Sequence, residues 1–266
     1  MIPVGDSPRS TGTPWVNYAL IAANLLVFLY MLGLSTALPT SARDQRQEFS
    51  DQTAGVCYGF RTAPTEADRF ICRFGFQPRE FFDAVTGRTE VANPQPAAAV
   101  LLTIVTAMFL HAGWLHILGN MLFLWVFGDN VEDRLGHWRY FAFYLVAGMG
   151  AALVQGWVDP ATVIPSVGAS GAVAGVLGAY IVWFPRASVR VVFPIFPLFF
   201  FPLPIPAVIM IGVWFLQNLL AGFATINEAA GADAGVAWFA HIGGFAFGML
   251  MALAARPRRA PPRWPG

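Results

Sequence analysis

Long uncharged apolar segments constrain this chain more than any other feature. The first runs from about Trp15 to Leu34, and a helix of ~20 residues spans the ~30 Å hydrocarbon core of a bilayer. Only 12% of the 266 residues are charged, whereas soluble domains carry about 25%. The pattern predicts an all-α, polytopic membrane protein with six transmembrane helices, at about residues 15–34, 114–128, 138–157, 170–184, 206–222 and 237–255.

The segments between these helices differ in character. Residues 1–14 are predicted to form a flexible cytoplasmic tail, 15–255 one domain, and 256–266 a basic, Pro-rich cytoplasmic tail. Prolines 194, 197, 202, 204 and 206 exclude a helix before the fifth span, so irregular or extended backbone is expected there. An apolar stretch from about Pro96 is expected to skim the membrane before the second helix begins near Trp114.

The largest block of charge lies between the first and second helices, where it alternates with aromatic residues. This composition predicts a large, structured first loop lying partly in the membrane interface. Both cysteines, Cys57 and Cys72, belong to it. They form a disulfide if the loop faces an oxidising compartment, and are otherwise two unrelated thiols; the sequence leaves both readings open.

Arginine placement predicts the orientation. Nine of the sixteen basic residues fall at the ends and loops on one side, whereas the short loops 158–169 and 223–236 contain none. The positive-inside rule therefore predicts that both termini are cytoplasmic. The net charge of +1 argues against nucleic acid as a partner, and the lipid bilayer is the expected environment.

Two faces of small residues lie on the fourth and sixth helices. Glycines at 168, 171, 175 and 178 line one side of the fourth, and Ala240, Gly244 and Gly248 line one side of the sixth. Such faces allow close backbone packing, which would bring His241 toward Ser170. A GxSG sequence alone more often indicates packing than catalysis, so Ser170 needs partners elsewhere in the chain.

Those partners are available near the same membrane face. His116 and Asn120 are four residues apart and share one helical face. Ser170 is the candidate nucleophile and His241 its general base. His116, Asn120 and the backbone N–H of Ser170 are candidate oxyanion donors. Because the predicted spans contain no Asp or Glu, a Ser–His dyad is expected; Gln155, Gln217 and Asn218 lie near helix ends and are attributed to snorkelling.

These motifs resemble those of a known family. GASG at 168–171, HAGWLHILGN at 111–120 and AHIGGFAFG at 240–248 resemble the rhomboid intramembrane serine proteases, in particular bacterial members. The resemblance implies a six-helix fold, cleavage of transmembrane protein substrates, and residence in the bacterial inner membrane. It also supports the residue assignments: catalytic Ser170 and His241, oxyanion partners His116 and Asn120, and supporting roles for His111, Gly168, Gly171 and Gly244.

The chain departs from the family pattern at two places. Some members carry a Tyr four residues after the serine, against which the histidine stacks; here that position is Ala174, so what orients His241 is not predicted. A Trp-Arg pair of many members' first loop is replaced by Leu102-Thr103, so a different anchoring of that loop is expected.

Other functions are weighed against the protease. A non-catalytic rhomboid-like membrane chaperone would bind transmembrane clients, but such proteins usually lack the serine or the histidine. A transporter is disfavoured, because no inverted repeat or intramembrane acid is present. No metal or other cofactor is expected, since HExxH is absent and His111 and His116 lack a third ligand. The natural substrate and the oligomeric state are not predicted.

Overall fold

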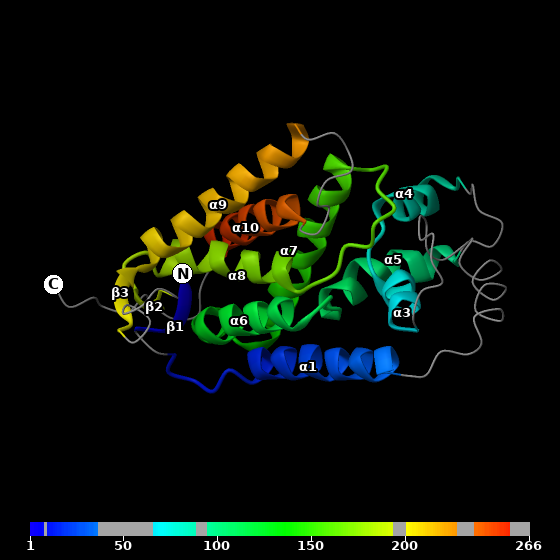
Figure 1. Ribbon diagram of the computed structural model, residues 1–266. Helices are drawn as coiled ribbons and strands as arrows, with labels where there is room; N and C mark the ends of the chain where they lie inside the picture. Colours follow the sequence, from blue (N-terminus) through cyan, green and yellow to red (C-terminus); the bar gives the residue numbers. More distant parts are fainter. Residues whose placement is uncertain (8–9, 37–65, 89–94, 194–200, 228–236, 256–266) are drawn as a thin grey trace.

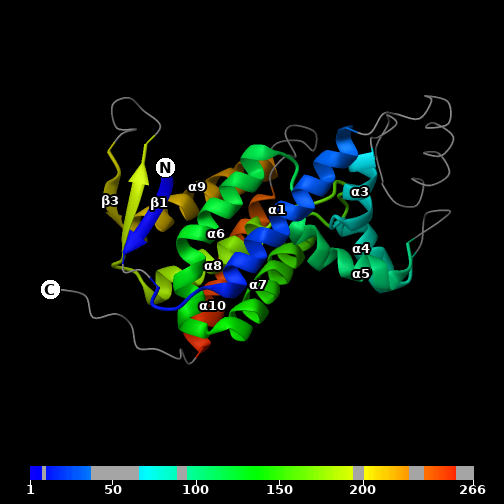
Figure 2. The same ribbon diagram turned by 90° about the horizontal axis from the view of Figure 1, so that it is seen from below.

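The computed structural model describes residues 1–7, 10–36, 66–88, 95–193, 201–227 and 237–255. Its helices lie side by side between two end structures (Figure 1). A small sheet occupies the end where the chain begins, and the short helices α3, α4 and α5 occupy the other end. The view from below shows the same separation (Figure 2).

Six apolar helices make up the body of the molecule: α1 (Trp15–Thr36), α6 (Trp114–Leu135), α7 (His137–Val158), α8 (Ser170–Trp183), α9 (Ala207–Asn227) and α10 (Trp238–Ala254). In the described chain, α1, α7 and α9 are long and apolar enough to cross a membrane, and α6 joins them when counted with the segment before it. Helices α8 and α10 are apolar but shorter. The predicted polytopic helical fold is confirmed.

The apolar segment predicted before the second helix forms a helix of its own. Helix α5 (Ala97–Thr106) and the 3₁₀ turn η1 (Ala107–Phe109) precede α6 and are bent from it by 80°. Two further helices, α3 (Glu66–Phe74) and α4 (Pro78–Thr86), belong to the first loop. Cys72 of α3 is fully buried and disulfide-bonded, while Cys57 and the tail 256–266 lie outside the described residues.

The second transmembrane helix is longer than predicted. The sequence suggests an end near Gly128, but α6 continues to Leu135. Its acidic last turns serve α1, since the Glu132 carboxylate accepts hydrogen bonds from the backbone N–H groups of Val16 (3.0 Å) and Asn17 (2.7 Å). A carboxylate at a helix N-terminus satisfies donors that the helix itself leaves unpaired. The acidic residues after Gly128 therefore belong to a helix that contacts the start of α1, and not to a loop.

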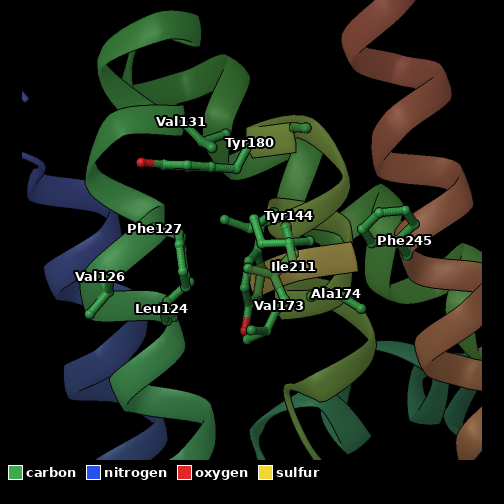
Figure 3. Close-up of a cluster of buried hydrophobic side chains, with 14 of the residues drawn as sticks. Leu124, Val126, Phe127, Val131, Tyr144, Val173, Ala174, Tyr180, Ile211 and Phe245 are labelled. Atoms are coloured by element: carbon green, nitrogen blue, oxygen red, sulfur yellow. The ribbon is translucent and has the colours of Figure 1, made fainter. Parts of the chain in front are cut away.

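Helix α8 lies at the centre of the bundle. Every residue from Gly171 to Tyr180 is buried. Figure 3 shows the Tyr180 ring of α8 reaching toward Phe127 and Val131 of α6, while Ala174 lies on the side of Phe245 of α10. The ring centroids of Tyr180 and Phe127 lie 4.9 Å apart in an edge-to-face arrangement. A helix buried on all sides holds its first residue, Ser170, in a fixed place.

The two small-residue faces meet, as predicted. A Cβ built on Gly244 would lie closer than 3.0 Å to the carbonyl oxygen of Gly171, and one on Gly248 equally close to that of Gly175. Real Cβ atoms essentially never come this close to a backbone atom. Helices α8 and α10 therefore touch backbone to backbone, a distance that glycine alone permits.

A three-stranded sheet is the part of the fold that the sequence prediction missed. Strand β1 (Ile2–Ser7) pairs antiparallel with β2 (Ser188–Val192), which pairs antiparallel with β3 (Leu203–Pro206). The prediction of a flexible N-terminal tail is wrong for residues 2–7, which form β1, and the sheet adds short strands to a mostly helical fold. The prolines of β3 are tolerated because β3 is an edge strand of this sheet.

Asp6 fixes β1 to the bundle. Its carboxylate is 8% exposed and accepts hydrogen bonds from the Tyr180 hydroxyl of α8 and from Asn130 Nδ2 of α6 (2.8 Å). Burial, aided by the nearby Asp129 carboxylate, raises the pKa of Asp6 to about 7. Three hydrogen bonds, from Tyr180, Asn130 and the Asp6 backbone, oppose this rise in pKa without cancelling it. The docked strand thus prefers a protonated Asp6.

Docking of β1 is expected to weaken as the pH rises. Between pH ~4 and ~7 the docked form binds more protons than a detached strand with an ordinary aspartate, so stability falls across this window. Hydrogen–deuterium exchange, corrected for its intrinsic pH dependence, should show at least about tenfold less protection of β1 amides at pH 8 than at pH 5. Asp6→Asn, neutral at both pH values, should remove the difference. Equal protection in the unmodified protein would contradict the expectation.

Candidate active site

The segment that leads into α8 is shaped by Gly168. Its φ of +123° is a conformation that L side chains rarely adopt. A Cβ there would also lie 2.6 Å from His116 Nε2. The Gly168 N–H donates to the carbonyl oxygen of Ala107 in η1 (2.9 Å), which ties the segment to the first loop. Glycine therefore allows His116 to approach the backbone just before Ser170.

The first loop is anchored to the same segment. Backbone hydrogen bonds join Phe76 and Ser166 in an antiparallel bridge, at 3.1 and 2.8 Å. The Thr106 hydroxyl donates to the carbonyl oxygen of Phe74 (2.6 Å). These contacts join the first loop to the segment before α8 and hold α3 against α5.

Ser170 is the first residue of α8 and is partly exposed. Its N-cap residue, Ala169, makes no side-chain capping bond. The N–H groups of the first turn, including those of Ser170 and Gly171, have no partner within the helix. Ser170, Gly171 and Ala172 border a cavity of about 40 Å³. A hydroxyl, unpaired backbone donors and a small cavity therefore coincide at one helix N-terminus.

His241 lies in the first turn of α10, whose backbone contacts the start of α8. Gly171 approaches the Ala240 carbonyl oxygen, with a built Cβ 3.7 Å away, so the residues next to Ser170 and His241 are in contact. Ser170 and His241 are not hydrogen-bonded to each other in the described chain. Catalytic hydrogen bonds are often long before substrate binds and tighten in the complex.

Three side chains surround His241. Asn218 Oδ1 of α9 lies 2.6 Å from His241 Nδ1. The rings of Trp214 and Trp238 each have centroids 6.0 Å from the imidazole centroid, the first tilted and the second edge-on. These neighbours contact the imidazole from α9 and from the first turn of α10.

His111 lies between His116 and Asn120 of α6 and the segment that precedes Ser170. His111 Nε2 lies 3.1 Å from Asn120 Nδ2 and accepts a long bond from the Ala169 N–H (3.5 Å). Its ring centroid is 5.0 Å from that of His116. Because an amide NH₂ has two donors, Asn120 keeps a second N–H beyond its bond to His111. The structure thus gathers His111, His116 and Asn120 beside Gly168 and Ser170.

Comparison with known proteins shows the family of the chain. The Rhomboid domain family matches residues 98–258, which include every site residue described above. The chain belongs to the rhomboid family. It is accordingly an integral membrane protein, and its glycine-packed α8 and α10 lie within the matched range.

Relatives named as rhomboids come from plants, yeast, an ape and a bacterium. RHOMBOID-like protein 1 of Arabidopsis thaliana is 27% identical over 253 residues, which are 90% of this chain and 52% of the relative. RHOMBOID-like protein 6, mitochondrial, of the same plant is 37% identical over 63% of this chain and 50% of the relative. Rhomboid protease AarA of Providencia stuartii is 30% identical over 56% of this chain and 53% of its own length. This rhomboid spans about half the length of these relatives.

Two amides of this rhomboid do more than the sequence predicted. Gln155 Oε1 accepts from the Ala240 N–H (3.2 Å) at the start of α10, and Asn218 contacts His241. Snorkelling is therefore the wrong interpretation for both side chains. Asn218 is buried, whereas its neighbour Gln217 is exposed. A burial pattern along α9 could have separated them, because the helix turns ~100° per residue.

Proposed function

We propose that this protein is an intramembrane serine endopeptidase in which Ser170 and His241 form the catalytic dyad. The observation that supports the proposal is the backbone contact of α8 with α10, in which Gly171, next to Ser170, lies against Ala240 and Gly244, on either side of His241 in the sequence. The first turn of α8 supplies unpaired N–H donors, and His116 and Asn120 lie beside it. Gly168, Gly171 and Gly244 permit these approaches, and His111 holds Asn120.

The reaction follows ordinary serine protease chemistry. His241 Nε2 accepts the Ser170 hydroxyl proton as Oγ attacks the scissile carbonyl carbon. The carbonyl oxygen becomes an oxyanion, which accepts hydrogen bonds from the Ser170 N–H, His116 and Asn120. The C–N bond then breaks, and His241 returns the proton to the leaving amine. Water, activated by His241, hydrolyses the acyl-enzyme and restores Ser170.

Depth in the membrane defines the substrate class. Helix α8 has 14 residues, a length of ~21 Å against a ~30 Å hydrocarbon core. With the C-terminal end of α8 at one membrane surface, Ser170 lies several Å below the other. The substrates we propose are transmembrane segments of membrane proteins, cleaved in or near the bilayer.

Two independent features support the orientation. A disulfide at Cys72 in the first loop suits an oxidising compartment, and the arginine distribution assigns both termini to the cytoplasm. Ser170 and His241 then open toward the external side. We place the protein in the bacterial inner membrane, with β1 and the other strands of its sheet on the cytoplasmic side.

An active-site probe tests this function directly. A fluorophosphonate should label the folded protein in detergent or liposomes, and mass spectrometry should locate the adduct on Ser170. His241→Ala should lose the labelling, because the hydroxyl then lacks its base. Heat-denatured protein is the control. An unlabelled but folded protein would favour the alternative, a non-catalytic rhomboid-like chaperone that binds transmembrane clients.

A further inference from the structure

A buried amide on α9 contacts the proposed general base. Asn218 Oδ1 lies 2.6 Å from His241 Nδ1, within hydrogen-bond range, and Asn218 is 4% exposed. We propose that Asn218 is a positioning residue that fixes the tautomer and the ring orientation of His241. This inference rests on the function proposed above.

The orientation of the amide follows from its second contact. The other end of the Asn218 side chain lies 2.7 Å from the backbone carbonyl oxygen of Trp214. A carbonyl oxygen only accepts, so the group facing it is the NH₂ of Asn218. The amide oxygen must then face the imidazole. Only one placement of the amide oxygen and nitrogen of Asn218 satisfies both contacts.

The contact with Asn218 also determines the tautomer of His241. Because Asn218 Oδ1 only accepts, His241 Nδ1 must carry the proton that it donates. In a neutral imidazole the lone pair then resides on Nε2. This is the nitrogen that must take the Ser170 hydroxyl proton. Asn218 therefore selects the tautomer in which His241 can act as a base.

Neither flanking ring can replace this bond. An indole offers only an N–H donor, so Trp214 and Trp238 cannot accept from His241 Nδ1. The side chain of Ala174 carries no polar atom. Within the described ranges, the hydrogen-bond acceptor for His241 Nδ1 is Asn218 Oδ1. The two tryptophans confine the imidazole ring sterically, and the hydrogen bond to Asn218 sets its orientation.

The position of α9 is thereby coupled to catalysis. Asn218 and Trp214 lie one turn apart on α9, and the Trp214 ring also packs near Phe123 of α6, with centroids 6.3 Å apart. His241 belongs to α10 and Ser170 to α8. The base is consequently oriented only while α9 is docked against the other helices.

Three variants separate positioning from stability. Asn218→Leu keeps the approximate volume but removes the acceptor, and should lower kcat on a transmembrane substrate by about 10- to 100-fold with KM within about twofold. Asn218→Asp keeps an oxygen in the same place and should restore kcat to within about tenfold of the unmodified enzyme. Gln217→Leu, the same change at the neighbouring exposed amide, should leave kcat unchanged. Fluorophosphonate labelling rates should follow kcat, since acylation needs the same base.

The outcomes are distinguishable. A folded Asn218→Leu protein with kcat within threefold of the unmodified enzyme overturns the positioning role, as does an Asn218→Asp protein no better than Asn218→Leu. If Asn218→Leu does not fold, Asn218→Asp decides: kcat above a tenth of the unmodified value supports the role, and a lower value overturns it. Cleavage that persists in both Ser170→Ala and His241→Ala would instead overturn the proposed function.

Discussion

Ser170→Ala is expected to abolish cleavage of a transmembrane substrate. The variant removes one oxygen atom, yet no other group at the start of α8 can form the acyl-enzyme, because the neighbours Ala169, Gly171 and Ala172 have no nucleophilic side chain. Loss of a serine nucleophile typically costs about 10⁴- to 10⁶-fold in kcat. Such a loss places the activity below detection in a gel assay with reconstituted enzyme and substrate.

The fold should not change in this variant. Ser170 is partly exposed and lies at the end of α8, whose packing depends on the residues from Gly171 onward. Thermal unfolding in detergent should therefore match that of the unmodified protein within a few degrees, and substrate binding should persist. Measurable cleavage by a purified, folded Ser170→Ala protein would rule out the dyad as proposed.

The parts predicted correctly from the sequence are those that local spacing encodes. Glycines at 171 and 175, and at 244 and 248, repeat every four residues, so each pair lies on one face whatever the rest of the fold does. Their mutual contact follows, because small faces in a membrane pack best on one another. The apolar lengths likewise required helices at nearly the observed positions.

The parts that were missed depend on distant partners. Strand β1 is six residues long and contains Pro and Gly, so nothing local distinguishes it from a tail. Its partner β2 is more than 180 residues away, and Asp6 is buried only because Tyr180 and Asn130 supply donors. Pairings over such separations leave no periodic signal in a single sequence.

Asn218 illustrates the same limit inside the site. The sequence predicts that the fifth helix ends near Gly222, and an amide close to a helix end is interpreted as a group that reaches for water. Helix α9 continues to Asn227, so Asn218 lies in its middle. Its role depends on the rotation of α9 relative to α10, which turns Asn218 inward and Gln217 outward. The candidate residues of the motifs could be named from the sequence, whereas the group that orients His241 could be found only from the packing.

Gly244→Ala is expected to have the second-largest effect, through stability and activity together. The new Cβ would lie closer than 3.0 Å to the carbonyl oxygen of Gly171, a backbone atom that cannot rotate away. Helices α8 and α10 must then separate, and overpacking of this kind costs about 1–3 kcal/mol or more. Because Gly171 follows Ser170 and Gly244 lies one turn from His241, the separation also moves the dyad apart. A misplacement of ~1 Å can cost ~10²-fold in rate.

Gly212→Ala on α9 is the matched control, because a Cβ at Gly212 meets nothing within 4 Å. The substitution is the same, in another membrane helix, yet it should leave cleavage intact and stabilise the helix slightly, by about 0.5–1 kcal/mol. If both variants kept full activity and the same unfolding temperature, backbone contact between α8 and α10 could not be what sets the Ser170–His241 distance. If only Gly244→Ala loses activity, glycine is required at this position because two backbones meet there, and the reacting groups are held by the contact between helices.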